Sequence, residues 1–220
     1  MESVSQLIGE AIESINQADA EKYLRTYFGL DGAAPYGGAM FETIGHRWDD
    51  EACVDTVTPA DLLSLSMLNV PIAAETIAAL LEPDLQARLG SLLAKIPATA
   101  TIVDEANLLA ERSAARELWA ELSAVPGLVK GTTTKSKLFA RKRPLLVPIY
   151  DSVVRDFVRL SGPDGFWLGM RDALMADESS HYRRAEGLVR DLGLQDRVTP
   201  LRAIDVTLWM HGQQMKAQAR

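Results

Sequence analysis

The stretch VPGLVKGTTTKSKLFARKRPLLVPIYDSVVR, from Val125 to Arg155, holds the features that decide the fold. It opens with a Pro-Gly pair, reaches a further glycine at Gly131 and continues as a basic helical run until Pro144 and Pro148 break it. A helix that ends in Pro-Gly, turns through a glycine and begins again predicts two helices joined by a hairpin. The free amides at the start of the second helix would then face an anion.

The second half of this hairpin is strongly basic. Its six cations are Lys130, Lys135, Lys137, Arg141, Lys142 and Arg143, and no acidic residue interrupts them. The rest of the chain carries 17 basic against 30 acidic residues, so the charge is polarised. An acidic body with one basic face predicts binding to the phosphates of DNA or RNA, with an affinity that falls steeply with salt. The alternative is that the run is an ordinary solvated helix face.

Length and composition set the broad class. The 220 residues, 47% of them hydrophobic, are enough for one sizeable core or for one core with a smaller lobe. No apolar run approaches the roughly 20 residues of a membrane span, and the acidic, amphipathic N-terminus does not read as a secretion signal, so we expect a cytoplasmic protein without a membrane partner. Cys53 is the only cysteine and the three histidines are isolated, so neither a metal site nor a cofactor is predicted. The sequence specifies no oligomeric state.

Apolar residues recur at helical spacing nearly throughout, which predicts an all-α fold. We expect a single globular domain of about eight to ten helices around a helix-hairpin-helix at 103–142. Thr58-Pro59-Ala60-Asp61 predicts a capped helix start. The expected helices cover 5–28, 59–71, 72–82, 84–95, 103–123, 149–160, 165–176, 180–193 and 200–217. The glycine-rich segment 29–50 fits no nucleotide-binding pattern and is predicted to be a linker or lid.

The hairpin resembles the helix-hairpin-helix motif of the DNA glycosylase and AP-lyase superfamily. That pattern reads Leu-Pro-Gly-Val-Gly and places an aspartate about 20 residues beyond its second glycine. Asp151 stands 20 residues after Gly131. The resemblance covers 124–159 and implies that Gly131, Thr132, Thr133 and Thr134 hold a phosphate. Lyase-type members carry a Schiff-base lysine where this chain has Thr133, so the resemblance implies a monofunctional DNA N-glycosylase-like hydrolase.

Asp151 has two interpretations. In the one that the resemblance implies, its carboxylate stabilises the cationic sugar, or orients water, as an extruded base leaves. In the other, it is an acid in the first turn of a helix, where the helix dipole favours it, and it pairs with Arg155.

A pocket for the base would need further side chains. His46, Arg47, Trp48 and Asp49 lie together in one loop and could stack on or hydrogen-bond a base, and Tyr150 and Asp205 are the other candidates. The structural alternative is that Trp48 anchors a long loop to the core and that Asp205 is a buried acid paired with an arginine.

The segments LFARKRPLLVPIYDSVVR, Gly45 to Asp49 and Leu201 to Met210 are similar to an uncharacterised bacterial protein family of unknown function. Two other functions therefore stay open: a non-catalytic helix-hairpin-helix module that binds nucleic acid or a protein, and a small-molecule enzyme that uses 29–50 as a lid. A glycosylase needs a base-sized pocket walled by Asp151, whereas a binding module needs only the exposed hairpin.

Overall fold

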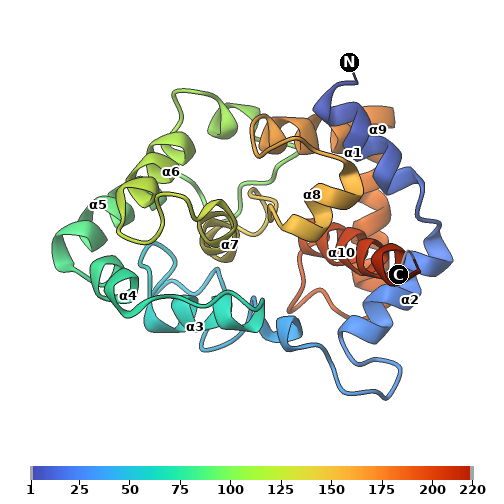
Figure 1. The fold of residues 1–220 in the computed structure, drawn as a ribbon, viewed down its shortest axis with the longest axis horizontal. Helices are drawn as coiled ribbons and strands as arrows, with labels where there is room; N and C mark the ends of the chain where they lie inside the picture. The colour runs from blue at the N-terminus through green and yellow to red at the C-terminus, as the bar shows by residue number, and fades with distance from the viewer. Residues whose placement is uncertain (1, 219–220) are drawn as a thin grey trace. The chain divides into compact units, whose positions relative to one another are not determined.

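The computed structural model describes residues 2–218, the side chain of Ala106 excepted, and Figure 1 shows helices joined by loops. Residues 2–218 form ten α-helices and two short 3-10 helices, with no strand among them. The predicted all-α class is confirmed. None of these helices is both long and apolar enough to cross a membrane.

The chain is organised as two compact units, and the first is discontinuous in sequence. The terminal unit consists of 1–39 and 148–220, and the middle unit consists of 40–147. This division was not predicted, because neither crossing point has the composition of a flexible linker.

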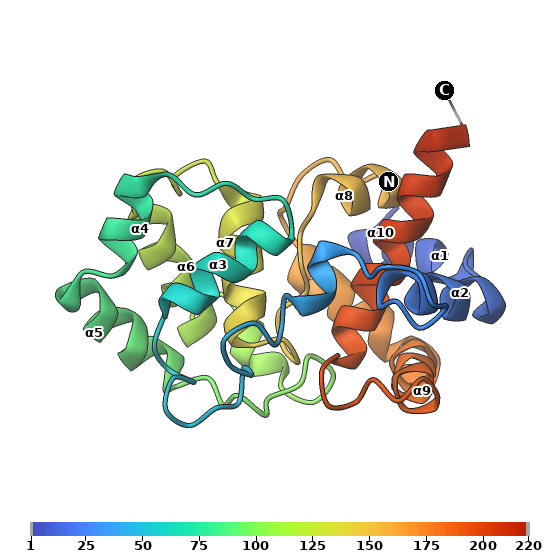
Figure 2. The same cartoon turned by 90° about the horizontal axis from the view of Figure 1, so that it is seen from below.

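Five helices make up the terminal unit: α1 (Val4–Glu13), α2 (Gln17–Tyr27), α8 (Ser152–Val158), α9 (Phe166–Asp191) and α10 (Pro200–Gln218). Helix α1 packs along α9, while α10 contacts α2, α8 and α9 (Figure 2). Its core is aliphatic and aromatic, with Ile8, Leu24 and Leu174 fully buried.

Two helix predictions in the terminal unit meet different outcomes. The single helix expected at 5–28 is wrong, because the side chain of Asn16 accepts a hydrogen bond from the amide of Asp19 (2.9 Å) and starts a new helix there. The two helices expected at 165–176 and 180–193 correspond to α9, whose backbone leaves the helical conformation from Ala176 to Ser179.

The middle unit contains α3 (Pro59–Met67), α4 (Ala74–Leu80), α5 (Pro83–Leu93), the 3-10 helix η2 (Ala106–Leu109), α6 (Ala114–Ala124) and α7 (Thr132–Lys142). The 3-10 helix η1 (Gly37–Met40) spans the chain boundary at which the terminal unit's first segment ends. Helix α7 contacts both α3 and α6. Every residue from Lys135 to Lys142 is buried, so α7 is the central helix of the unit.

The capped start of α3 is as predicted. Thr58 Oγ1 accepts the amide of Asp61 (3.2 Å), and Asp61 Oδ2 accepts the amide of Thr58 (2.9 Å), which makes a reciprocal capping box. The long helix expected at 103–123 is wrong, because Ser113 caps a new helix and only the residues after it form α6. The first helix of the helix-hairpin-helix expected at 103–142 therefore begins later than predicted, at Ala114, and the motif itself stays a prediction.

Candidate nucleic-acid interface

The segment between α6 and α7, residues 125–131, is a succession of tight turns that we call the hairpin. The amide of Leu128 donates to the carbonyl of Val125, and the amide of Gly131 donates to that of Leu128, both over 3.0 Å. Gly127 has a φ of +80°, a left-handed conformation that a glycine adopts without steric cost. Residues 125–131 therefore turn the chain from α6 into α7.

The Pro-Gly side of the hairpin is packed inside the middle unit. Thr76 of α4 donates its hydroxyl to the carbonyl of Pro126 (2.9 Å) and is itself buried. A Cβ atom on Gly127 would lie only 2.2 Å from that hydroxyl oxygen. This glycine thus admits a close approach of α4 to the hairpin.

The other side of the hairpin is the start of α7. Gly131 occupies the N-cap position and, having no side chain, leaves the helix without a side-chain cap. Thr132, Thr133 and Thr134 follow in the first turn and are partly exposed. Lys130, directly before Gly131, is exposed. An uncapped helix start with hydroxyl side chains and one exposed lysine is chemically suited to an anion.

The expected basic face is wrong. Five of the six cations, Lys135, Lys137, Arg141, Lys142 and Arg143, have at most 5% of their surface exposed, and only Lys130 is exposed. Four of these buried cations donate hydrogen bonds to backbone carbonyls inside the middle unit. Residues 41–57 form turns and bends without a helix, so their carbonyl groups have no helical amide partners and must be satisfied by other donors.

Arg141 and Lys142 satisfy much of this loop. Arg141 donates to the carbonyls of Phe41 (2.9 Å), Ile44 (2.9 Å) and His46 (2.8 Å), and Lys142 donates to that of Cys53 (2.8 Å). Both also bind the carboxylate of Asp61, through contacts of 2.9 and 3.0 Å. The two cations therefore hold the loop to the start of α3.

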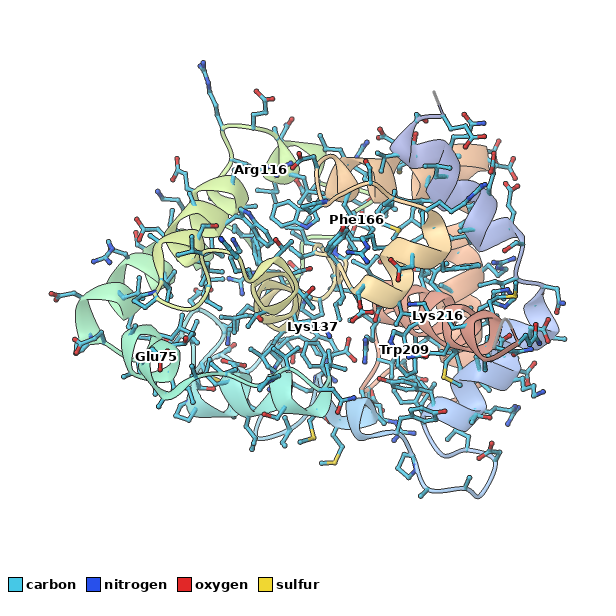
Figure 3. The ribbon with its side chains drawn as sticks, viewed as in Figure 1. Glu75, Arg116, Lys137, Phe166, Trp209 and Lys216 are labelled. Carbon is cyan, nitrogen blue, oxygen red and sulfur yellow. The ribbon has the colours of Figure 1, made fainter. Side chains whose placement is uncertain are left out.

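The other buried cations act in the same way. Arg143 donates to the carbonyls of Val54 (2.9 Å) and Leu93 (2.6 Å) and pairs with Asp55. Lys137, labelled on α7 in Figure 3, donates to the carbonyl of Leu68 (3.2 Å).

Lys135 lies beneath the first turn of α7. Its ammonium donates to Ser123 Oγ (2.7 Å) and sits 4.9 Å from the ring centre of Trp119. Burial lowers the pKa of this lysine. It therefore packs α7 onto α6 and presents no charge directly to a ligand.

Burial of the cations makes the surface more acidic than the sequence suggests. The described structure buries six basic residues (the five above and Arg202) and three acidic ones (Glu42, Asp61 and Asp205). The remaining chain has 17 basic against 27 acidic residues. An anionic ligand is therefore opposed by the general field of the protein and must be held by local groups.

Asp151 is the N-cap residue of α8. Its Oδ1 accepts a hydrogen bond from the amide of Val153 (2.8 Å), as the capping interpretation expects. Arg155, proposed as its partner, forms its ion pair with Asp156 (2.6 Å). Asp151 belongs to the terminal unit, whereas Gly131 belongs to the middle unit.

The loop residues expected at a base pocket have structural partners. His46 is bonded through Nδ1 to the carbonyl of Arg47 (2.8 Å) and through Nε2 to Thr58 Oγ1 (3.0 Å). Trp48 is buried, with the Arg47 guanidinium 4.6 Å from its ring centre, and Arg47 also pairs with Asp49 (2.7 Å). The alternative in which Trp48 anchors this loop is the one that these contacts support.

Tyr150 and Asp205 belong to the terminal unit, whereas His46 to Asp49 belong to the middle unit. Tyr150 is buried with its ring edge-on to Phe166 at 5.3 Å, and burial raises its pKa (Figure 3 labels Phe166). Asp205 is bound by Arg202, which also donates to the hydroxyl of Tyr27 (2.9 Å). The buried acid paired with an arginine is thus the arrangement observed.

The terminal unit contains a small apolar cavity, lined by residues of α1, α2, α9 and α10, among them His181 and Leu208, and by Ile15 between α1 and α2. The cavity has a volume of about 20 Å³, which is room for about one water molecule. None of the residues expected at a base pocket lines it.

A family profile matches residues 20–212, which is most of the chain. The chain belongs to the DUF6308 family. This family is described as one of unknown function, so membership supplies no activity. No curated protein and no solved structure significantly matches the chain.

Two features of the sequence of this DUF6308 chain could have indicated that the cations are buried. The run Lys135 to Arg143 contains Leu138 and Phe139 and leads directly into the apolar segment Pro144 to Tyr150. An exposed basic face has no need of such an apolar continuation, whereas a central helix does. The complementary sign is Asp61, an acid at a capped helix start on the core side, which requires cationic partners when buried.

Proposed function

We propose that this protein is a non-catalytic nucleic-acid-binding module that contacts a phosphate of DNA, or of RNA, with the first turn of α7. The observation that carries the proposal is the uncapped start of α7 after Gly131, flanked by three partly exposed threonines and the exposed Lys130. Helix starts of this kind bind phosphate through backbone amides and the positive end of the helix dipole.

Local charge supports this position over the rest of the surface. No acidic residue occurs in the sequence between Glu121 and Asp151, so the segment that forms the hairpin and α7 adds no repulsion of its own. One exposed acid, Glu75 on α4, is the sequence neighbour of Thr76, which binds the hairpin. Contacts of this kind position a phosphate backbone and read no sequence.

The test is a set of single variants measured by fluorescence anisotropy with a labelled duplex at low salt. Thr133→Glu places an acid in the first turn of α7, where it favours the helix dipole and so preserves folding, yet repels a phosphate. We expect it and Lys130→Glu to weaken binding, and Glu75→Gln to strengthen it modestly. The double variant Lys22→Glu with Lys95→Glu changes two exposed lysines elsewhere and serves as the control. Unchanged affinity in Thr133→Glu, or no binding by the unmodified protein at low salt, would remove the proposal.

A second candidate is base excision with Asp151, favoured by its 20-residue spacing from Gly131 and by its N-cap position, which fixes one carboxylate oxygen on the amide of Val153. Asn caps helices as well as Asp does, so Asp151→Asn keeps the cap and removes only the charge that a cationic transition state requires. Excision should leave an intact abasic site and no borohydride-trapped adduct, and it should be lost in Asp151→Asn with affinity unchanged. Full excision activity in this variant would return Asp151 to capping alone.

A further inference from the structure

Tyr36 is an exposed aromatic residue in the terminal unit, with 42% of its surface accessible. Its neighbours in the chain are small or short: Gly32, Ala33, Ala34, Pro35 and Gly37 are all exposed. No bulky side chain from this segment shields the ring. Tyrosine is enriched at binding interfaces, because its ring offers a large apolar face and its hydroxyl a polar end.

The ring of Tyr36 belongs to a three-ring cluster with Tyr27 and Trp209, which we call the Tyr36 platform. Tyr36 is stacked on Tyr27 with ring centres 5.1 Å apart and planes inclined by 11°. Trp209 of α10, labelled in Figure 3, is nearly perpendicular to both, at 6.1 Å from Tyr27 and 5.9 Å from Tyr36.

These distances locate the free face of Tyr36. A ring covering the outer face of Tyr36 would lie much farther from Tyr27 than from Tyr36. Because Trp209 is almost equidistant from the two, it lies beside the pair and faces their edges. Tyr27 covers the inner face of Tyr36, so the outer face is the part that neither ring covers, in agreement with its exposure.

The segment that carries Tyr36 is held in place by its own contacts. The amide of Tyr36 donates to the carbonyl of Tyr27 (3.0 Å), which closes the loop. Asp31 accepts from the Thr26 hydroxyl (2.8 Å) and from the amide of Ala33 (3.1 Å), and these bonds lower its pKa. Gly29, with a φ of +70°, lets Pro35 pack closely against the turn, because a Cβ there would lie 3.2 Å from the proline ring. The loop therefore presents the ring in one orientation, which reduces the entropy lost on binding.

We propose that the Tyr36 platform binds an unpaired nucleobase by stacking on the outer face of Tyr36, and this inference rests on the proposed nucleic-acid-binding function. A nucleobase extends the stack that Tyr27 begins, and stacking of this kind accepts any base. A cationic ligand is disfavoured, because the guanidinium of Arg202 already lies 5.5 Å from the ring centre of Tyr27, although Asp205 partly neutralises it.

The experiment compares a short oligodeoxyadenylate with an abasic oligonucleotide of the same length, so that the phosphates are matched and only the bases differ. Tyr36→Ala should weaken binding of the oligodeoxyadenylate about fivefold to 150-fold and leave binding of the abasic strand unchanged. Tyr36→Phe keeps the ring and should restore the affinity. The loop-closing bond is made by the backbone amide, which the alanine variant retains. Oligoriboadenylate and free adenosine monophosphate distinguish RNA, DNA and a free nucleotide as the source of the base.

The outcomes separate this inference from the proposed function. Thr133→Glu should weaken both oligonucleotides, whereas Tyr36→Ala should affect only the one that has bases. Tyr36-dependent binding of adenosine monophosphate without any hairpin-dependent binding would sustain the platform and remove the phosphate contact. Equal affinities of Tyr36→Ala and the unmodified protein for every probe would overturn the platform, as would competition by tetramethylammonium but not by adenosine monophosphate.

Discussion

Arg141 donates a hydrogen bond from Nε to Oδ1 of Asp61 across 2.9 Å, and neither side chain is exposed to solvent. The other oxygen of Asp61 accepts from Lys142 Nζ (3.0 Å) and from the amide of Thr58 (2.9 Å). The cap of α3 and the cations of α7 are therefore parts of one buried network. Arg141 also donates hydrogen bonds to the carbonyls of Phe41, Ile44 and His46, which joins this loop to the same network.

Removing Asp61 should destabilise the protein strongly. Asp61→Ala leaves Arg141 and Lys142 buried without their carboxylate, and breaking a buried pair from one side costs about 3–5 kcal/mol. The free energy of unfolding in urea measures the effect. Asp49→Ala is the matched control, since Asp49 also pairs with an arginine, but both side chains are at least 40% exposed and such pairs contribute about 1 kcal/mol or less. Similar losses in the two variants would contradict the role given to the network.

The Asp61 network also predicts how stability responds to acid. Burial by itself raises the pKa of Asp61, but Lys142, the amide of Thr58 and Arg141 together more than offset it, and the pKa falls below its usual 3.8. The unfolded chain then binds a proton at a pH at which the folded chain does not. The stabilisation is therefore fully present above about pH 3.8 and is lost as the pH falls through the folded value.

Unfolding free energy measured against pH for the unmodified protein and for Asp61→Asn checks this. The difference between the two should shrink as the pH falls below 3.8. A difference that stays constant into strong acid would show that Asp61 contributes by packing and not by charge.

The fold was largely predictable where local chemistry specifies it. Thr58-Pro59-Ala60-Asp61 caps α3 as its residue types require, and the helical spacing identified the all-α class. The errors fall where a capping side chain interrupts an apolar pattern that continues across it. Asn16 and Ser113 each start a helix inside a segment whose periodicity favours a single longer one.

The candidate site was less predictable, because it depends on which side of a helix faces inward. Charge alone places Lys137 and Arg141 on the surface, where cations are usually found. Their buried partners are backbone carbonyls distant in sequence, those of Phe41, Ile44 and His46 for Arg141 and that of Leu68 for Lys137, and no local pattern marks them. Asp151, in contrast, stands at the start of a helix as the sequence indicated, one position before the first turn, and it caps that helix.

Two glycines of positive φ offer a test of how the hairpin is packed. Gly127→Ala and Gly32→Ala both place an alanine in the left-handed region, which costs about 1–2 kcal/mol. At Gly32 nothing lies within 4 Å of the new methyl group, whereas at Gly127 Thr76 Oγ1 lies 2.2 Å away. Gly127→Ala should therefore destabilise the protein more than Gly32→Ala, as thermal unfolding would show.

The excess should come from Thr76. Thr76→Ala removes the clashing oxygen, so the double variant Gly127→Ala with Thr76→Ala should lose less stability than the sum of the two single variants. Strict additivity would mean that the hairpin moves away from α4 when the methyl group is added.

The burial of the basic run predicts how nucleic-acid binding depends on salt. For duplex DNA the logarithm of the binding constant falls with the logarithm of salt concentration at a slope of about −0.9 for each phosphate neutralised. Six exposed cations would give a slope of about −5, whereas the single exposed Lys130 gives about −1 from this segment.

Dissociation constants for one duplex over a series of salt concentrations measure the slope. Lys130→Gln should bring this slope close to zero. Lys95→Gln changes an exposed lysine just after the end of α5 and should leave the slope unchanged. A slope near −5 in the unmodified protein would mean that the cations of α7 leave Asp61 and the loop carbonyls on binding, which their hydrogen bonds in the free protein argue against.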